Sequence, residues 1–142
     1  MGRGKGSAFY GAAWERELEE ILVRELPILD LGAIHRLREW GGEGLPRKMV
    51  EIFLANSPSR MDQIRKGIEE EDSRNVEAGA HSLKSSAGNV GGLRLQELLK
   101  EVEALGASQE LEEARGRLPT LVEVFQKTCR ALEDYLEGPP EE

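Results

Sequence analysis

One short segment of the sequence gathers the side chains that could do chemistry. It reads Ala80-His81-Ser82-Leu83-Lys84-Ser85-Ser86-Ala87-Gly88-Asn89-Val90-Gly91 and places a histidine three residues before a lysine. A neutral imidazole has a free lone pair near pH 7, because its ordinary pKa is about 6.5, so it can act as a nucleophile without a dedicated base. On a helix, a lysine three residues later can pair with an anionic group bound to that imidazole. We therefore take His81 and Lys84 as candidate catalytic residues.

The helical period indicates which way these side chains face. Residues at intervals of three and four define a buried stripe, which consists of Val76, Ala80, Leu83, Ala87 and Val90. His81 and Lys84 lie on the neighbouring stripe, at the boundary with water. Ser85 and Gly88 follow His81 by four and seven residues and lack bulk, so a partner protein could approach the ring closely. Ser85 and Gly88 are thus candidate partner-binding residues.

The same segment resembles the motif of the histidine phosphotransfer (HPt) domain family, His-x-Leu-Lys-Gly-Ser-x-x-x-hydrophobic-Gly. The resemblance runs from His81 to Gly91, and its one departure is Ser85, where the family most often has glycine. It extends to the order of predicted helices from about Pro27 to Leu136, including Leu29-Asp30-Leu31 before the first of them. Residues 1–26 lie outside it.

The resemblance implies a function in a multistep two-component phosphorelay. Nε2 of His81 would take a phosphoryl group from an aspartyl phosphate on a response-regulator receiver domain and pass it to another receiver, while Lys84 partly neutralises the charge. The implied partners are receiver domains and a hybrid histidine kinase, and the chain would be a phosphocarrier rather than a kinase. No cofactor is expected, because the receiver supplies its own Mg²⁺ and lysine. We also expect no metal site, since two histidines on separate helices and a lone cysteine offer no ligand set.

The composition limits the class of protein. A length of 142 residues allows one modest core but not an ATP-binding domain beside a substrate domain. Abundant Leu, Glu and Arg with 5% aromatic residues is typical of an all-helical protein with charged exposed faces. The net charge of −8 argues against nucleic acid or a membrane as partner. Without an apolar run near twenty residues, and with Cys129 alone, the cytoplasm is the expected location.

We divide the chain into four segments. Residues 1–7 form a glycine-rich disordered start, 8–26 an extra N-terminal helix, 27–137 the HPt-like bundle and 138–142 a disordered tail. The apolar side of the extra helix carries Trp14, Leu18, Ile21 and Leu22. This helix either packs across the bundle as a lid or binds a second copy or another protein.

Within the bundle, a short helix follows Asp30, which can cap its start, and should bury Leu31, Ile34 and Leu37. Four longer helices should begin near residues 45, 73, 93 and 109, and Gly106 should end the third of them. Short connections favour antiparallel neighbours. The predicted fold is therefore all-α: an antiparallel up-down-up-down four-helix bundle with a short preceding helix and an extra N-terminal helix.

Two other classes of function have to be weighed against a phosphocarrier. A lone histidine beside a buried stripe is usually structural, so the fold could serve as a helical binding or scaffold module without phosphotransfer. A histidine kinase fragment is disfavoured, because Ser82 stands where an acidic residue would follow the kinase histidine and no nucleotide-binding glycine boxes occur. His35, beside Arg36 and Arg38, is expected to be exposed and without function.

Overall fold

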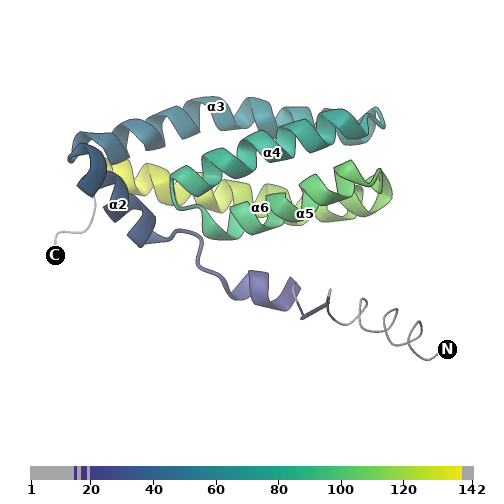
Figure 1. Cartoon of the computed structure of the whole chain (residues 1–142), viewed down its shortest axis with the longest axis horizontal. Helices are drawn as coiled ribbons and strands as arrows, with labels where there is room; N and C mark the ends of the chain where they lie inside the picture. The colour runs from purple at the N-terminus through teal and green to yellow at the C-terminus, as the bar shows by residue number, and fades with distance from the viewer. Residues whose placement is uncertain (1–14, 16, 19, 139–142) are drawn as a thin grey trace.

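The structure is a computed structural model, and it describes residues 15, 17, 18 and 20–138. All the regular structure within these residues is helical, as Figure 1 shows. The labelled helices are α2 (Leu31–Gly41), α3 (Gly44–Glu69), α4 (Ser73–Asn89), α5 (Leu93–Ala107) and α6 (Leu111–Glu137). Before them, residues 15, 17, 18 and 20–25 are also helical. The predicted all-α fold is confirmed, whereas the predicted disordered start, Trp14 and tail residues 139–142 lie outside the described residues.

Helices α3, α4, α5 and α6 form the bundle. Each is joined to the next by only three residues, at 70–72, 90–92 and 108–110, and such short connections make consecutive helices antiparallel. Helix α4 packs against α3 on one side and α5 on the other, while α6 contacts both α5 and α3 and closes the ring. This arrangement is consistent with the predicted up-down-up-down order.

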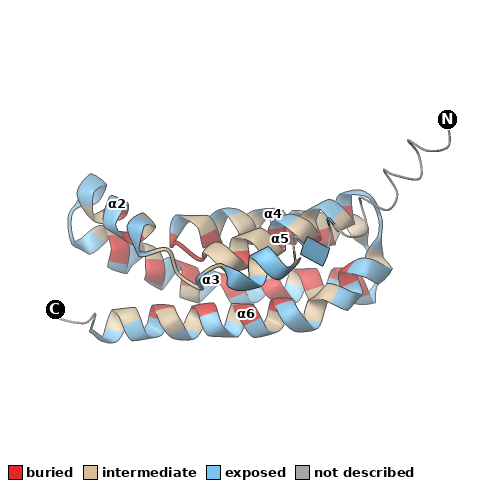
Figure 2. Cartoon of the chain, turned by 90° about the horizontal axis from the view of Figure 1, so that it is seen from below, coloured by how far each residue is buried: buried red, intermediate tan, exposed pale blue. Residues whose placement is uncertain are grey.

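The core lies along the axis of the bundle, and each of its four helices contributes a buried stripe (Figure 2). The five residues of the predicted α4 stripe are all buried, from Val76 through Val90. Opposing side chains from α5 and α6 include Leu95, Leu99, Leu121 and Leu132. Removal of this apolar surface from water is the main force that fixes α4 in one rotational setting. The residues beside its stripe are consequently held at the water boundary.

Aspartate side chains cap the starts of α2 and α4, and the cap at Asp30 was predicted. The side chain of Asp30 accepts a hydrogen bond of 3.0 Å from the backbone N–H of Gly32, at the start of α2. Asp72 accepts one of 3.2 Å from the backbone N–H of Asn75, at the start of α4. Each cap satisfies a backbone donor that the first helical turn leaves without a partner.

The turn after α4 ties this helix to α2. Gly91 has a φ of 76°, and the backbone N–H of Asp30 donates a hydrogen bond of 2.6 Å to the Gly91 carbonyl. A Cβ on Gly91 would lie 2.6 Å from the carbonyl oxygen of Asp30. Glycine is therefore required here both by the left-handed backbone and by the closeness of the two chain segments.

Two local predictions are wrong. Leu31 is 66% exposed rather than buried, because the buried side of α2 is centred on Ile34 and Leu37, and Leu31 lies on the flank of that side. Gly106 does not end its helix, since α5 continues to Ala107 and Gly106 is buried inside the last turn. Its buried side faces the backbone of Glu77 on α4.

The N-terminal segment lies beside the bundle rather than in it (Figure 1). Glu20 forms an ion pair with Arg117 of α6, and Arg94 Nε of α5 donates a hydrogen bond of 2.8 Å to the carbonyl of Leu26. Leu18, Ile21 and Leu22 remain exposed. Within the described residues, no helix is both long and apolar enough to cross a membrane.

Candidate functional site

His81 stands on the outer side of α4, with its side chain 63% exposed. Its Nδ1 lies 2.8 Å from Oε2 of Glu103, which belongs to α5. None of the described residues hydrogen-bonds the other ring nitrogen, Nε2. The imidazole is therefore held on one side and open to solvent on the other.

Glu103 is the centre of the site. While Oε2 contacts His81, Oε1 lies 2.7 Å from Nζ of Lys84, so one carboxylate joins both candidate catalytic residues. The Lys84 ammonium holds the pKa of Glu103 below its ordinary value, His81 acts in the same direction, and partial burial opposes both. The carboxylate is thus ionised near neutral pH.

The carboxylate determines which nitrogen of His81 carries the proton. An ionised carboxylate can only accept hydrogen bonds, so the neutral ring must place its proton on Nδ1 to make this contact. The lone pair then lies on Nε2, the nitrogen that faces solvent. The same contact limits rotation of the ring and keeps Nε2 directed away from the bundle.

The packing of α4 against α5 positions Glu103. Leu95, Leu99 and Val102 are buried along α5, and Glu103 follows Val102 at the edge of that stripe, with its side chain 21% exposed. Glu103 is not among the candidate residues predicted from the sequence. A glutamate next to a buried stripe could have been noted from periodicity, but only the axial alignment of α5 with α4 shows that it reaches His81 rather than solvent.

Of the two candidate partner-binding residues, Ser85 is exposed one turn after His81 on α4. Gly88 is half-buried, and the side chain of Gln96 from α5 packs over it, since a Cβ at Gly88 would lie 2.5 Å from Nε2 of Gln96. The part that each plays in binding a partner stays a prediction. Ser86 Oγ donates a hydrogen bond of 3.2 Å to the carbonyl of Ser82, one turn earlier on α4.

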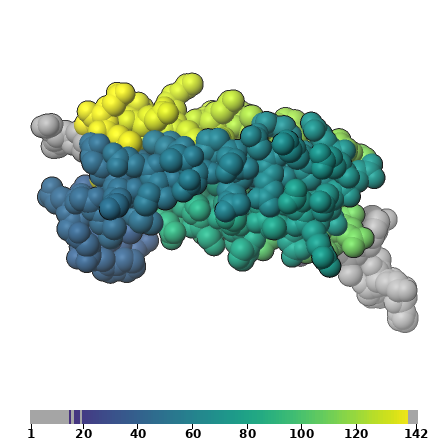
Figure 3. Space-filling model, turned by 90° about the horizontal axis from the view of Figure 1, so that it is seen from above, coloured from purple at the N-terminus to yellow at the C-terminus, as the bar shows by residue number. Residues whose placement is uncertain are grey.

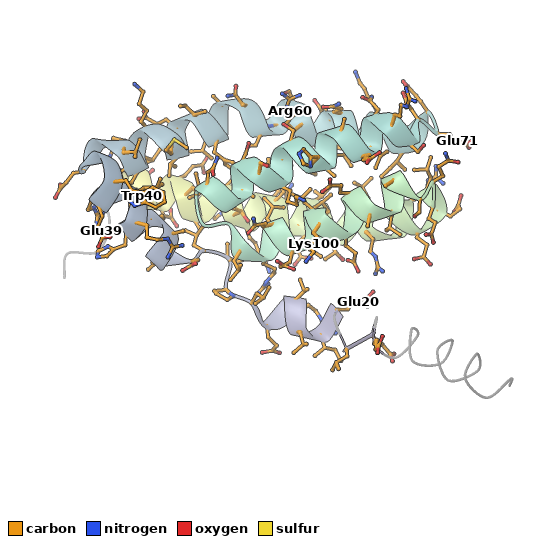
Figure 4. The ribbon with its side chains drawn as sticks, viewed as in Figure 1. Glu20, Glu39, Trp40, Arg60, Glu71 and Lys100 are labelled. Carbon is orange, nitrogen blue, oxygen red and sulfur yellow. The ribbon has the colours of Figure 1, made fainter. Side chains whose placement is uncertain are left out.

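A shallow groove lies between α3 and α4, on the other side of the motif helix from Glu103. Helix α3 lines it with both apolar and polar side chains, and α4 with small polar ones; they include Met49, Ile52, Asn56 and Arg60 of α3 and Ser82 and Ser86 of α4. Ile52 is 46% exposed, and Figure 4 shows Arg60 on α3. The surface that α3 and α4 form together is seen in Figure 3.

Among the residues that the structure describes, no three His, Cys, Asp or Glu side chains are arranged to hold a metal ion. His35, the second histidine of the chain, is exposed on α2, and its Nδ1 lies 3.4 Å from the Arg38 guanidinium.

The fold and site together define an all-helical bundle that presents one histidine, oriented by a carboxylate, on the outer side of a central helix. The sequence model of the Hpt domain family matches residues 48–138, which is more than half of the chain. The chain belongs to the Hpt domain family. It is a histidine phosphotransfer protein of the kind that acts in phosphorelays, where such domains interact with response-regulator receivers and kinases.

Solved structures confirm the fold. The histidine-containing phosphotransfer protein B of Pseudomonas aeruginosa PAO1 is 21% identical, with a TM-score of 0.73 and coverage of 80% of this chain and 97% of that one. A putative histidine-containing phosphotransfer protein from rice is 17% identical, with a TM-score of 0.69 and coverage of 89% and 95%. No curated protein matches the sequence.

Proposed function

We propose that Nε2 of His81 carries the phosphoryl group, which it takes from an aspartyl phosphate on one receiver domain and passes to an aspartate of another. The observation that carries this proposal is the 2.8 Å contact between Nδ1 and Glu103, which leaves the lone pair on the exposed Nε2. A hybrid histidine kinase is a further proposed partner, as the source of a phosphorylated receiver. The bundle that performs this function is proposed to span residues 27–137.

The transfer requires little more than alignment. The Nε2 lone pair attacks phosphorus, the bond from phosphorus to the aspartyl oxygen breaks, and the aspartate leaves with that electron pair. The Nδ1 proton stays on the ring, where Glu103 accepts its hydrogen bond and stabilises the positive charge that develops on the imidazole. Onward transfer is the same step in reverse, on a different aspartate.

Lys84 is proposed to contact the transferred group. Its ammonium lies one turn from His81 and is held 2.7 Å from Glu103, so it approaches the ring from the side of α5. A phosphoryl group on Nε2 offers this ammonium a second anion within reach of its flexible side chain. Lys84 would then be shared between the carboxylate and the phosphoryl oxygens.

The receiver is proposed to cover the outer surface of α4 and the adjoining groove on α3. The small side chain of Ser85 leaves room for a partner to approach His81, and the exposed Ile52 provides an apolar side chain at the centre of the surface. Apolar contact of this kind would hold the partner while the polar rim, including Arg60, sets its orientation. Gly88 would lie at the edge of the covered area.

The test uses purified wild-type chain, His81→Gln and His35→Gln, each incubated with a receiver domain phosphorylated by a small-molecule phosphodonor. We expect acid-labile phosphate on the wild type and on His35→Gln, but none on His81→Gln. His35→Gln is the matched control because His35 is the other histidine of the chain. Label on His81→Gln would refute the assignment, and absence of label on all three folded proteins would favour a binding module without phosphotransfer.

A further inference from the structure

We propose that Gly106 is a positioning residue for the phosphotransfer site: its lack of a side chain sets the distance between α4 and α5 at which Glu103 reaches both His81 and Lys84. The inference rests on the function proposed for His81. Gly106 lies outside the segment from His81 to Gly91 that resembles the family motif, and it touches none of the reacting atoms.

The backbone conformation does not require glycine at this position. Among the described glycines, only Gly42, Gly91 and Gly138 have a positive φ, so Gly106 has a conformation that any residue can adopt. Nor does Gly106 end α5, which continues to Ala107. In a helix interior, glycine costs about 1 kcal/mol relative to alanine, which makes it a poor choice unless space demands it.

Space does demand glycine here. A Cβ on Gly106 would lie 2.9 Å from the backbone nitrogen and 3.1 Å from the Cα of Glu77, both on α4. These are backbone atoms of a packed helix and cannot rotate away as the end of a side chain can. A Cβ would therefore have to move α5 away from α4.

The site is one turn away from this contact on both helices. Glu103 precedes Gly106 by three residues on α5, and His81 follows Glu77 by four residues on α4, so the glycine contact and the carboxylate bridge are successive contacts of one helix pair. For a Cβ on Gly106 to reach an ordinary contact distance from Glu77, α5 would have to move about 0.5 Å farther from α4. The same displacement would stretch the 2.8 Å bond from His81 to Glu103 beyond the length of a strong charge-assisted hydrogen bond.

Two other glycines provide matched controls. Gly116, which is exposed on α6, has nothing within 4 Å of the place where a Cβ would stand. Gly88 lies on the same helix pair, but there a Cβ would meet only the amide end of the flexible Gln96 side chain. Alanine at either position should therefore leave the spacing between α4 and α5 unchanged.

The first experiment measures the Glu103 carboxyl pKa by NMR in the unphosphorylated full chain, for wild type, Gly106→Ala, Gly88→Ala and Gly116→Ala. We expect the pKa of Glu103 to rise toward its ordinary value in Gly106→Ala alone, because the ammonium of Lys84 is then farther away. An unchanged pKa in folded Gly106→Ala would overturn the proposal. This readout needs no phosphotransfer, so its failure is distinct from failure of the function proposed for His81.

The second experiment measures the rate of phosphotransfer from a phosphorylated receiver in a double-mutant cycle. We expect Gly106→Ala to slow transfer about fivefold in the wild-type background and to have no further effect in a Glu103→Gln background. A merely structural role would slow transfer equally in both backgrounds, and that result would contradict the proposal.

A second variant keeps the proposal testable if Gly106→Ala does not fold. Glu103→Asp withdraws the carboxylate by about 1.5 Å, one carbon–carbon bond, without any change at the helix contact. We expect the transfer rate of Glu103→Asp to fall at least as far as the fivefold expected for Gly106→Ala. A wild-type rate in Glu103→Asp would show that the spacing is unimportant, and the proposal would then be wrong.

Discussion

Lys84 on α4 and Glu103 on α5 form an ion pair of 2.7 Å, and the same carboxylate accepts a hydrogen bond from His81. The lysine of the motif is thus not a free cation at the surface. It is held by a residue of the next helix, which the motif does not contain. The pairing determines how variants of either residue should behave.

Lys84→Ala should slow phosphotransfer by about tenfold or more, because the positive charge nearest to the transferred group is lost. The free energy of unfolding should change by less than about 1 kcal/mol, since partly exposed ion pairs contribute little. Rapid-quench transfer assays and urea unfolding measure the two effects. Lys127→Ala is the control, because Lys127 forms an exposed ion pair of 3.2 Å with Glu123 on α6. Equal rates for the two variants would contradict the prediction.

Glu103→Gln should remove a contribution to stability that depends on pH. The pKa of Glu103 is lowered in the folded chain, chiefly by Lys84. The carboxylate therefore stabilises the fold fully at pH values above 4.5, the ordinary pKa that it has in the unfolded chain. This stabilisation is lost as the pH falls through the lower pKa of the folded chain. Urea unfolding should show wild type more stable than Glu103→Gln at pH 7, with the difference gone at a pH below the folded pKa. A difference that persists there would indicate packing rather than charge. Glu123→Gln is the exposed control.

Gly91→Ala should destabilise the fold by about 2 kcal/mol or more, because alanine at a φ of 76° is strained and its Cβ would lie 2.6 Å from the Asp30 carbonyl. Thermal unfolding followed by circular dichroism measures the loss. Gly116→Ala should instead be neutral or stabilising, since alanine is the better helix former and its Cβ meets nothing within 4 Å. Similar melting temperatures for the two variants would refute the account of Gly91.

Glu20→Gln should loosen the N-terminal segment without altering the site. Glu20, labelled in Figure 4, pairs with Arg117 of α6, whereas Arg117 also keeps a contact of 3.3 Å with Glu101 of α5. We expect faster hydrogen exchange of the backbone amides at 20–26, unchanged exchange in α4, and a transfer rate within about twofold of wild type. Glu25→Gln, on the exposed side of the segment, should exchange like wild type. A slower transfer rate in Glu20→Gln would connect the segment to the site.

Periodicity predicted most of the framework that presents His81. The stripe from Val76 to Val90 is buried as expected, and Asp30 caps the start of its helix as expected. These features depend on residues close together in the chain, for which spacing of three and four is a direct signal.

Contacts between helices could not be predicted in the same way. Glu103 is separated from His81 by 22 residues, and whether it meets His81 or water depends on how far α5 slides along α4. The prediction that Gly106 ends its helix was wrong for the same reason. A glycine that ends a helix and a glycine that lets a neighbouring backbone approach cannot be told apart by their position in the sequence. In both cases the deciding atoms belong to a different helix.

The shared carboxylate has a consequence for how long the protein stays phosphorylated. At rest, one ammonium and one carboxylate balance beside a neutral ring. A phosphoryl group on Nε2 carries about two negative charges, while the ring that keeps its Nδ1 proton carries one positive charge, so loading adds about one net negative charge. The phosphoryl oxygens also repel the Glu103 carboxylate, which already shares the ammonium of Lys84. We expect this repulsion to raise the free energy of the phosphorylated chain and to shorten its lifetime in the presence of a receiver. The contact between Glu103 and His81 that orients the ring would thereby also favour release of the phosphoryl group.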